Sequence, residues 1–491
     1  MSETGRSTGI PIPGWADRVA DSLGAGPHVV VSGISVSGNI HAGNLREVLV
    51  AEAVANALRQ RGEEVHFIFH ADTIDPLRKI APGIPNSYER YIGHSLSHIP
   101  DLEGCHVSYA EHFLVPFEEA LAEMEMDIEV LRSHELYERG VYTGVTSEAI
   151  ENTGELREIL QQVTNRQMPE NWSPYLPRAE SGKLTGNLVI SHLPERTSVL
   201  YTDEDGREGN ADYSRGQGKL GWRVELAARW KALGVTFEPF GKDHTSRGGS
   251  TDTADRMARE VFDYPVPGRF EYEWIGLKGR GDMSSSRGIV LLPRDLLRIM
   301  PPGAVRRIIL GRDPARRFDI DLEGGFPRFM DEYRAEVGGP YVPFSHLVTV
   351  AQTVGVDTEA AAQMLRRSGY EDAVGYGLAD DLYYARNWAA EWAPESMRLG
   401  LLDPAESEQE AAALDDEQRE YLREVSEKLR PEMDGEAIQD VLYSTAIERG
   451  LRPKRAFAAV YKVLLGKTSG PKAGPFIAGL NLDQVSQRFS V

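Results

Sequence analysis

The chain has 491 residues, which is enough for two to four domains and more than one hydrophobic core. Hydrophobic residues make up 41% of it and charged residues 26%, as in an ordinary globular protein. No apolar run approaches the roughly 20 residues that cross a membrane, and the N-terminus lacks the basic start and apolar core of a signal peptide. We therefore expect a cytoplasmic protein with no membrane partner.

The charge is unevenly distributed along the chain. A net charge of −21 argues against nonspecific binding of nucleic acid by the whole surface, but it leaves room for a local basic face. Phe457 and Tyr461 lie in a basic region and either stack on bases or, at helical spacing with Val460 and Leu464, belong to a core, which is the interpretation we favour. The basic residues of this region are Arg449, Arg452, Lys454, Arg455, Lys462, Lys467 and Lys472.

Cys105 is the only cysteine, which excludes an intramolecular disulfide framework and a Cys-rich zinc site. Free cysteine commonly behaves as a small hydrophobic residue, so we predict that Cys105 is buried. On this count of ligands we expect no bound metal.

The first predicted elements are a strand, a tight loop and a helix. His28 to Val31 form an apolar, β-branched run typical of a buried strand, and Leu45 to Leu58 have a helical pattern. The loop between them contains Gly33, Ser35, Ser37 and Gly38. A helix N-terminus binds phosphate readily, and His41 can donate a hydrogen bond to a phosphate oxygen. The alternative, equally open, is that the glycines only make a tight turn and His41 caps the helix.

The next segment, EEVHFIFHADTID, is a second strand, so residues 28–80 form a βαβ unit with a parallel sheet and a right-handed crossover. Ligands bind such sheets at the carboxyl ends of their strands. We therefore expect His70, Asp72 and Asp75 to point towards the same site as His41.

The chain then changes pattern several times. Residues 101–220 resemble an insertion, helical at first and later short, polar and turn-rich with strand-like segments. A helix, a strand and a glycine turn follow in WRVELAARWKALGVTFEPFGKDH. After about residue 301 strand signals nearly vanish, and from Phe344 onward the pattern is helical.

A second stretch, GLKGRGDMSSSRG, has no apolar face to bury. Lys278, Arg280 and Arg287 flank a Gly/Ser-rich loop, which offers positive charge and hydroxyl donors to a pyrophosphate leaving group. An ordinary basic surface loop is the alternative. The predicted short loop and helix that follow at residues 291–300 favour the functional interpretation.

The two stretches, SGISVSGNIHAGNLRE and GLKGRGDMSSSRG, together resemble the HIGH and KMSKS motifs by which class I aminoacyl-tRNA synthetases handle ATP. With DPLRKI, WSP, WRVELAARWKALGVTFEPFGKDH, YEWIGLKG and GPKAGPF, in this order, the chain resembles class I lysyl-tRNA synthetases over almost its whole length. The resemblance implies an α/β Rossmann-type catalytic domain split by an insertion and followed by an all-α anticodon-binding domain, an α-helix cage.

The resemblance implies domain boundaries and site residues. The catalytic domain would comprise residues 1–100 and 221–300, with a connective insertion at 101–220, a junction that contacts the tRNA stem at 301–343 and the anticodon-binding domain at 344–491. The implied ATP-binding residues are Ser37, Gly38, His41, Gly43, Asn44, Ser284, Ser285 and Ser286, and catalysis would fall to His41, Asn44, Met283, Ser284, Ser285, Ser286 and Arg287. The implied amino-acid pocket contains Gly33, Ser35, Asp72, Trp222, Asp243, His244 and Tyr272, although core packing is an alternative for the two aromatic residues.

Several positions depart from the family pattern. Glu225-Leu226-Ala227 replaces Asp-Trp-Pro, Thr73 replaces an aspartate after Asp72, and Arg287 replaces a lysine. Ala42 is smaller than usual, Asp282 precedes Met283, and the Cys-rich knuckle of many members is missing. These changes cluster around the amino-acid pocket. They therefore bear most directly on which amino acid the pocket is expected to bind.

The resemblance implies that the enzyme activates lysine with ATP and Mg²⁺ to lysyl-adenylate and transfers it to tRNA(Lys). Its partners would be L-lysine and tRNA, and a monomer is expected. One alternative is a specialised paralogue that activates lysine or a related amino acid, or uses lysyl-tRNA, in secondary metabolism. The other is an inactive tRNA-binding regulator, against which the retained His41, Asn44 and MSSS argue.

Overall fold

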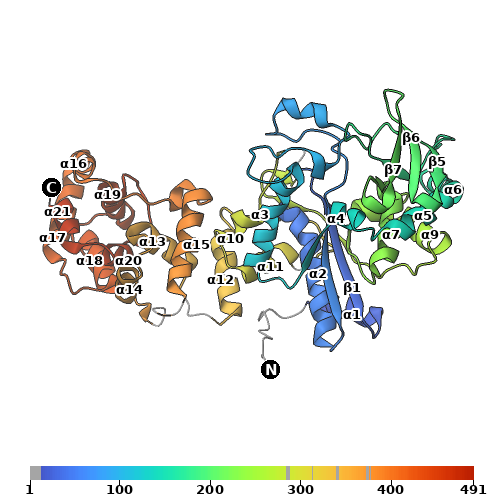
Figure 1. Cartoon of the computed structure of the whole chain (residues 1–491). Helices are drawn as coiled ribbons and strands as arrows, with labels where there is room; N and C mark the ends of the chain where they lie inside the picture. Colours follow the sequence, from blue (N-terminus) through green and yellow to red (C-terminus); the bar gives the residue numbers. More distant parts are fainter. Residues whose placement is uncertain are drawn as a thin grey trace. The chain divides into compact units, whose positions relative to one another are not determined.

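A computed structural model describes residues 13–283, 288–311, 313–338, 342–371, 375 and 377–490 (Figure 1). The chain divides into two compact units. The N-terminal unit runs to residue 296 and includes residues 305–320, and the C-terminal unit comprises residues 297–304 and 321–491. Ser284, Ser285, Ser286 and Arg287 of the second motif lie outside the described residues.

A parallel sheet forms the centre of the N-terminal unit. It contains β1 (His28–Ser35), β2 (Val65–Asp72) and β3 (Glu129–Arg132) in the order β1-β2-β3. The predicted βαβ unit is confirmed, because α2 (Ala42–Gln60) connects β1 to its parallel neighbour β2. Val30 and Val31 of β1 are fully buried, as expected for a β-branched strand in a parallel sheet. Helix α1 (Gly14–Leu23) packs on α2.

Residues 101–220 contribute to the central sheet as well as to a peripheral region. Strand β3 lies in this range, where the sequence predicts helices, and pairs with β2. The helices of the range are α3 (Tyr109–Glu123), α4 (Ser133–Glu138), α5 (Thr143–Glu151) and α6 (Thr153–Thr164). Its turn-rich part forms two antiparallel sheets, one of β4 (Tyr175–Pro177) and β8 (Gly218–Leu220) and one of β5 (Leu188–Leu193), β6 (Ser198–Thr202) and β7 (Glu208–Asp212).

The chain then returns to the edge of the central sheet. Phe237 makes a parallel bridge to Val30 of β1 and another to Gly268, so the segments on either side reach the carboxyl ends of the central strands. The elements here are α7 (Trp222–Leu233), β9 (Phe240–Gly241), α8 (Lys242–Thr245), α9 (Ser250–Glu260) and β10 (Glu271–Tyr272). A small sheet of β11 (Ile275–Leu277), β12 (Gly281–Asp282) and β13 (Phe318–Ile320) follows, with α10 (Pro293–Leu297) and α11 (Pro302–Leu310).

Among the described residues of the C-terminal unit, the regular elements are all helices, as predicted. Its apolar core includes Leu422, Leu442, Val460 and Tyr461, and Phe457 packs against it, so the core interpretation of the two aromatic residues is correct. Its helices after α11 are α12 (Phe326–Glu336), α13 (Phe344–Val354), α14 (Thr358–Arg367), α15 (Leu378–Glu391), α16 (Pro404–Ala412), α17 (Asp416–Lys428), α18 (Gly435–Glu448), α19 (Pro453–Leu465), α20 (Ala473–Ala478) and α21 (Leu482–Phe489).

The basic region of the C-terminal unit is partly neutralised by carboxylates. Arg449 pairs with Glu420 and Glu424, and Lys467 pairs with Glu395. Arg452, Lys454 and Lys472 are exposed.

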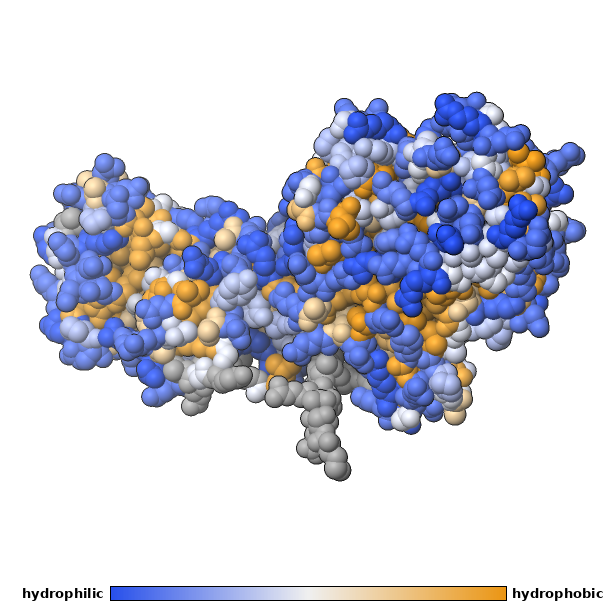
Figure 2. All heavy atoms as spheres, in the orientation of Figure 1, coloured by the Kyte–Doolittle hydropathy of each residue, from blue (hydrophilic) through white to orange (hydrophobic). Residues whose placement is uncertain are grey.

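The face drawn in Figure 2 is mainly hydrophilic with scattered hydrophobic groups. Within the described ranges, no helix has both the length and the apolar character that a membrane crossing requires.

Candidate active site

A cavity of about 480 Å³ opens at the carboxyl ends of β1 and β2. Most of the residues that the family resemblance implies lie on its wall: Gly33, Ser35, His41, Gly43, Asn44, Asp72, Trp222, Asp243, His244, Tyr272 and Met283. Ser37 and Gly38 lie in the β1–α2 loop and do not line the cavity. Segments that are 240 residues apart in the sequence therefore meet at one site, from β1, α2, β2, α7, α8 and β10.

The start of α2 forms one end of the cavity, which we call the helix end. His41 is the residue before the helix, and its backbone N–H donates to Asn44 Oδ1 at 3.1 Å. Its Nδ1 is buried and has no hydrogen-bond partner among the described residues. Burial lowers the pKa of His41 to about 4, so the imidazole is neutral near pH 7. A neutral ring with an unused nitrogen at a helix N-terminus suits a phosphate oxygen.

Gly43 keeps the His41 ring close to the helix. A Cβ atom at residue 43 would lie 2.9 Å from the ring atoms Cε1 and Nδ1 of His41 and 3.8 Å from Met283 Cβ. The backbone N–H of Ala42 donates to Leu291 O at 2.7 Å, which links the first motif to the segment after the second. The absence of a side chain at Gly43 therefore lets the His41 ring lie close to the helix backbone, as a nucleotide-binding helix N-terminus requires.

Another part of the wall, which we call the aromatic end, contains Trp222, His244 and Tyr272. The rings of Trp222 and His244 meet edge to face with their centroids 6.0 Å apart, and His244 Nδ1 lies 2.7 Å from Ser250 Oγ. The Tyr272 hydroxyl donates to Glu47 Oε2 at 2.5 Å. Trp222 and Tyr272 line the cavity while they pack, so core packing alone does not describe them.

A network of buried charges lies beneath this wall. Lys219 Nζ is 2.8 Å from Asp72, 3.4 Å from Asp75 and 2.7 Å from Glu225, and only 1% of its side chain is exposed. Burial lowers the pKa of Lys219, but the three carboxylates outweigh this and raise it above its usual value. Burial raises the pKa of Glu225 to about 7. The glutamate at position 225, where the family pattern has aspartate, therefore still supplies a carboxylate to Lys219.

The change at position 73 also leaves the cavity intact. Thr73 Oγ1 lies 2.7 Å from His134 Nδ1 and is not part of the wall. The second carboxylate on the wall is that of Asp75, which accepts a hydrogen bond from Ser35 Oγ at 3.0 Å. At another departure in the described residues, Asp282 pairs with Arg317 at 2.8 Å.

Sequence reasoning misplaced one residue and missed others. His70 lies below the cavity, where its ring contacts Tyr142 Oη at 3.0 Å and Arg229 Nη1 at 3.2 Å. Glu47, Arg229 and Trp274 line the cavity although the sequence analysis did not single them out. The helical spacing contained a signal for Glu47, because it lies three residues after Asn44 and so on the same face of α2.

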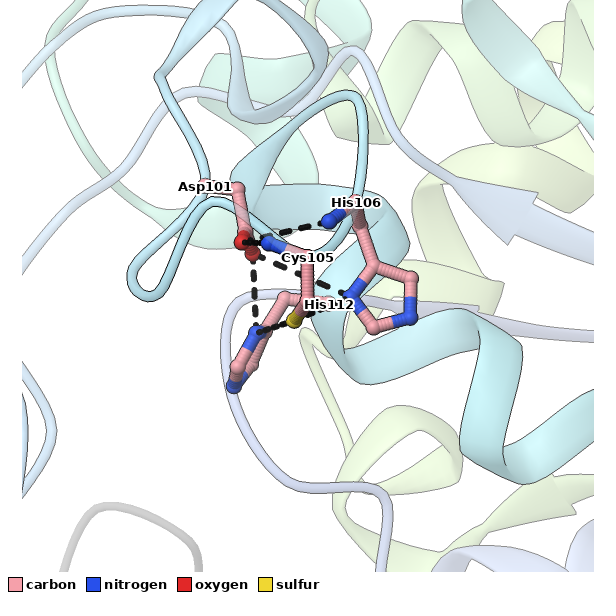
Figure 3. A group of neighbouring side chains, drawn as sticks. All are labelled: Asp101, Cys105, His106 and His112. Atoms are coloured by element: carbon pink, nitrogen blue, oxygen red, sulfur yellow. Dashed lines mark hydrogen bonds and ion pairs between the residues drawn. The ribbon is translucent and has the colours of Figure 1, made fainter.

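A second group of side chains lies outside this cavity, at the start of α3 (Figure 3). One ligand atom from each of Asp101, Cys105, His106 and His112 lies within 4.8 Å of all the others. Cys105 Sγ is 2.9 Å from His106 Nδ1, and Asp101 Oδ1 is 2.8 Å from His112 Nδ1. We call these four residues the Asp101–His112 cluster.

The Asp101–His112 cluster has donors that suit zinc. One thiolate, two imidazoles and one carboxylate make up a four-coordinate set of the kind that zinc accepts. Backbone N–H groups of Glu103, Cys105 and His106 donate to Asp101 Oδ2 and orient that carboxylate. The prediction of a buried Cys105 is wrong, because the residue is exposed. The expectation of no metal rested on counting cysteines, and this donor set needs only one.

The chain matches, over residues 14–341, the family described as tRNA synthetases class I (K). It is 39% identical to the lysine–tRNA ligase of Archaeoglobus fulgidus, over 96% of this chain and 99% of that one. It is 35% identical to the lysine–tRNA ligase of Methanococcus maripaludis, over 97% and 99%. Among solved structures, a glutamate tRNA ligase from Elizabethkingia meningosepticum in complex with its amino acid has a TM-score of 0.46 at 15% identity, over 94% of this chain and 98% of that one. The chain belongs to the class I lysyl-tRNA synthetases, a family of ligases.

Proposed function

We propose that this enzyme activates lysine with ATP and transfers it to tRNA(Lys). The observation that carries the proposal is the convergence of the first motif, Met283 and the aromatic end on one cavity. The helix end suits phosphates, and the aromatic end suits a long stem with a cationic tip.

The reaction has two steps. The carboxylate of lysine attacks the α-phosphate of ATP and releases pyrophosphate, and the ribose hydroxyl at the tRNA terminus then attacks the activated carbonyl. His41 and Asn44 hold the phosphate region at the start of α2, and Ser284, Ser285, Ser286 and Arg287 supply hydroxyl donors and positive charge for the pyrophosphate. Ser37 and Gly38 keep the β1–α2 loop near the nucleotide. The protein contributes mainly positioning and charge stabilisation, while Mg²⁺ neutralises the phosphates of ATP.

The amino-acid pocket comprises Gly33, Ser35, Asp72, Trp222, Asp243, His244 and Tyr272. A side chain at residue 33 would meet Arg229 Nη1 at 3.0 Å and the carbonyl oxygen of His70 at 3.2 Å, which explains the glycine. Asp243, with 52% of its side chain exposed, holds the α-ammonium group of the amino acid.

We assign the helical residues 344–491 to the anticodon and residues 301–343 to the tRNA stem. The exposed Arg452, Lys454 and Lys472 supply positive charge for the phosphate backbone. The protein acts as a monomer in the cytoplasm.

The Asp101–His112 cluster binds one structural zinc ion. Tyr109, which lies between His106 and His112 at the start of α3, donates its hydroxyl hydrogen to the carbonyl oxygen of Ser37 at 3.0 Å, so the cluster lies next to the first-motif loop. Elemental analysis of purified protein should give one zinc per chain, and His112→Ala should lose it. Zinc-free wild-type protein with unchanged thermal stability would contradict this assignment.

The alternative function is a specialised paralogue that activates lysine or a related amino acid. The departures at positions 73 and 225 motivated it, but neither one removes a carboxylate from the cavity or from Lys219. An inactive regulator would have no use for the unpartnered His41 nitrogen.

Amino-acid-dependent exchange of labelled pyrophosphate into ATP tests the proposal, run over a panel of amino acids and followed by charging of tRNA(Lys). We expect exchange with lysine and formation of lysyl-tRNA. Exchange with another amino acid, or lysine activation without tRNA charging, would favour the paralogue. No exchange with any amino acid would favour the regulator.

A further inference from the structure

Helix α2 carries a fully buried guanidinium group, that of Arg46, close behind the first motif. Within the described residues, its hydrogen bonds all go to backbone carbonyl oxygens rather than to a carboxylate. Burial lowers the pKa of Arg46 to about 10, so the group is still a cation near pH 7. A buried charge is costly unless its donors are satisfied, so these carbonyl contacts hold the group in place.

The two terminal nitrogens of Arg46 serve two segments that are about 40 residues apart in the sequence. Nη1 donates to the carbonyl oxygen of Glu273 at 2.7 Å and, more weakly, to that of Trp274 at 3.5 Å. Nη2 donates to the carbonyl oxygens of Arg316 at 3.3 Å and Asp313 at 3.4 Å. The guanidinium is a rigid fork, so it fixes the distance between the segments that it binds.

Both segments connect to the small sheet of β11, β12 and β13. Residues 273–274 run directly into β11, and β11 pairs with β12, which ends immediately before Met283. Residues 313–316 precede β13, which pairs with β11 in parallel. The segments also bond each other, because the backbone N–H of Glu273 donates to Pro314 O at 2.9 Å. The carbonyl groups that Arg46 binds therefore belong to the framework that leads to the second motif.

Arg46 thus joins the two sides of the ATP-handling region. His41 directly precedes α2 on one side, and the small sheet leads to Met283 on the other. The two sides approach closely, since a Cβ atom at residue 43 would lie 3.8 Å from Met283 Cβ. The guanidinium carbon of Arg46 also lies over the Phe318 ring of β13, 5.0 Å from its centroid. A shift of α2 against this sheet would separate a buried charge from its acceptors, which is unfavourable.

A second buried arginine binds the same helix away from the cavity. Arg306 forms a two-point ion pair with Glu52 of α2, at 2.8 and 2.7 Å, and donates to the carbonyl oxygen of Met124 at 2.7 Å. None of these three residues is on the described wall of the cavity. Arg46 differs, because it binds the carbonyl group of Trp274, which is on that wall. The two arginines therefore separate the stability of α2 from its alignment with the cavity.

We propose that Arg46 is a positioning residue for adenylate formation, which holds the helix of the first motif in register with the cavity wall and with the strands that lead to the second motif. This inference rests on the proposed activation of lysine by ATP. Arg46 is fully buried and is not on the described wall, so it acts through the segments that it binds and touches no substrate.

The assignment predicts a loss of rate rather than of amino-acid affinity. Attack on the α-phosphate needs the groups of α2 and of the second motif in one geometry, and a misplacement of about 1 Å can cost about 100-fold in rate. Binding of the amino acid alone does not require that alignment. The turnover number should therefore fall while KM for lysine stays nearly constant.

Lysine-dependent exchange of labelled pyrophosphate into ATP by the full chain tests the inference, with rates expressed per folded protein as measured by circular dichroism. For Arg46→Met we expect kcat to fall about 100-fold and KM for lysine to change by less than about threefold. Arg46→Lys keeps the charge but lacks the fork, so it should recover part of the rate and remain about tenfold below wild type. Arg306→Met is the matched control: it should lower the melting temperature at least as much as Arg46→Met, because it leaves Glu52 buried without its cation, and keep kcat within about threefold.

Each outcome supports or overturns the inference. A wild-type kcat in folded Arg46→Met, or an equal loss of kcat in Arg306→Met, would overturn it, because Arg46 would then serve stability alone. A raised KM for lysine with an unchanged kcat would also overturn it. If Arg46→Met does not fold, Arg46→Lys decides in its place: a lower kcat at constant KM supports the inference, and a wild-type kcat overturns it. A wild-type protein without lysine-dependent exchange contradicts the proposed function itself.

Discussion

Two groups of ion pairs, one in each unit, have similar composition and different surroundings. Lys219 contacts three carboxylates at 2.7–3.4 Å and is 1% exposed. Arg455 contacts Asp415 and Glu417 at 2.7 Å each and is 48% exposed. Removing a cation from the first group leaves charges that water cannot reach, whereas solvent replaces the cation of the second. Buried pairs therefore fix the geometry of the cavity, and exposed pairs leave the helical surface adaptable.

Replacing Lys219 should produce the largest effect on stability. Lys219→Met leaves Asp72, Asp75 and Glu225 without their cation, so we expect the free energy of unfolding to fall by about 3–5 kcal/mol in urea titrations at pH 7. Lys231→Met is a matched control, because Lys231 pairs with Glu148 at 2.8 Å while 35% exposed. Similar losses in the two variants would contradict the contrast between buried and exposed pairs.

The helix end of the cavity provides a different test, because its functional group, the His41 imidazole, is neutral and belongs to no ion pair. His41→Ala removes one donor to the developing phosphate charge, and we expect kcat for pyrophosphate exchange to fall by about 10²–10³-fold. Lysine affinity should not change. His66→Ala, on the exposed end of β2, is the control. Full exchange activity in His41→Ala would show that His41 serves only the start of α2.

Replacing Trp222 separates the contribution of packing from that of charge to ligand affinity at the aromatic end. Trp222→Ala should weaken lysine binding by about 1–3 kcal/mol through lost contact with the stem and lost attraction between the ring and the cation. Norleucine should lose most of the same amount, since the stem provides most of the contact. Calorimetry with both ligands checks this, and a loss confined to lysine would mean that Trp222 acts mainly on the ammonium.

Local patterns were sufficient to predict the elements around the helix end. The β-branched run before Gly33 and the helical spacing after His41 predict β1 and α2, and the parallel crossover follows from them. Strand β3 was not predictable in this way, because its EVLR segment is short and its side chains are exposed or half-buried, without a continuous apolar run. Its pairing with β2 is a tertiary effect.

The chemistry of the site was less predictable than its position. At position 73 the sequence shows only a lost carboxylate, and the direction of the Thr73 side chain towards His134 comes from the fold. The Asp101–His112 cluster combines a loop and the first turns of α3, and its mixed ligands escape a search based on cysteines. Glu47 had the right spacing, but only the structure shows that no cation balances it among the described residues.

The smallest expected effect is that of the exposed group in the C-terminal unit. Arg455→Ala should change the free energy of unfolding by at most about 1 kcal/mol, because solvent and ions screen its pairs with Asp415 and Glu417. The difference from wild type should shrink further as salt rises from 0.05 to about 0.5 M, where the screening length is only a few ångströms. Urea titrations at the two salt concentrations provide the measurement. A loss near that of Lys219→Met, insensitive to salt, would mean that the pairs of Arg455 also fix a local geometry, and that exposure alone does not separate the two groups.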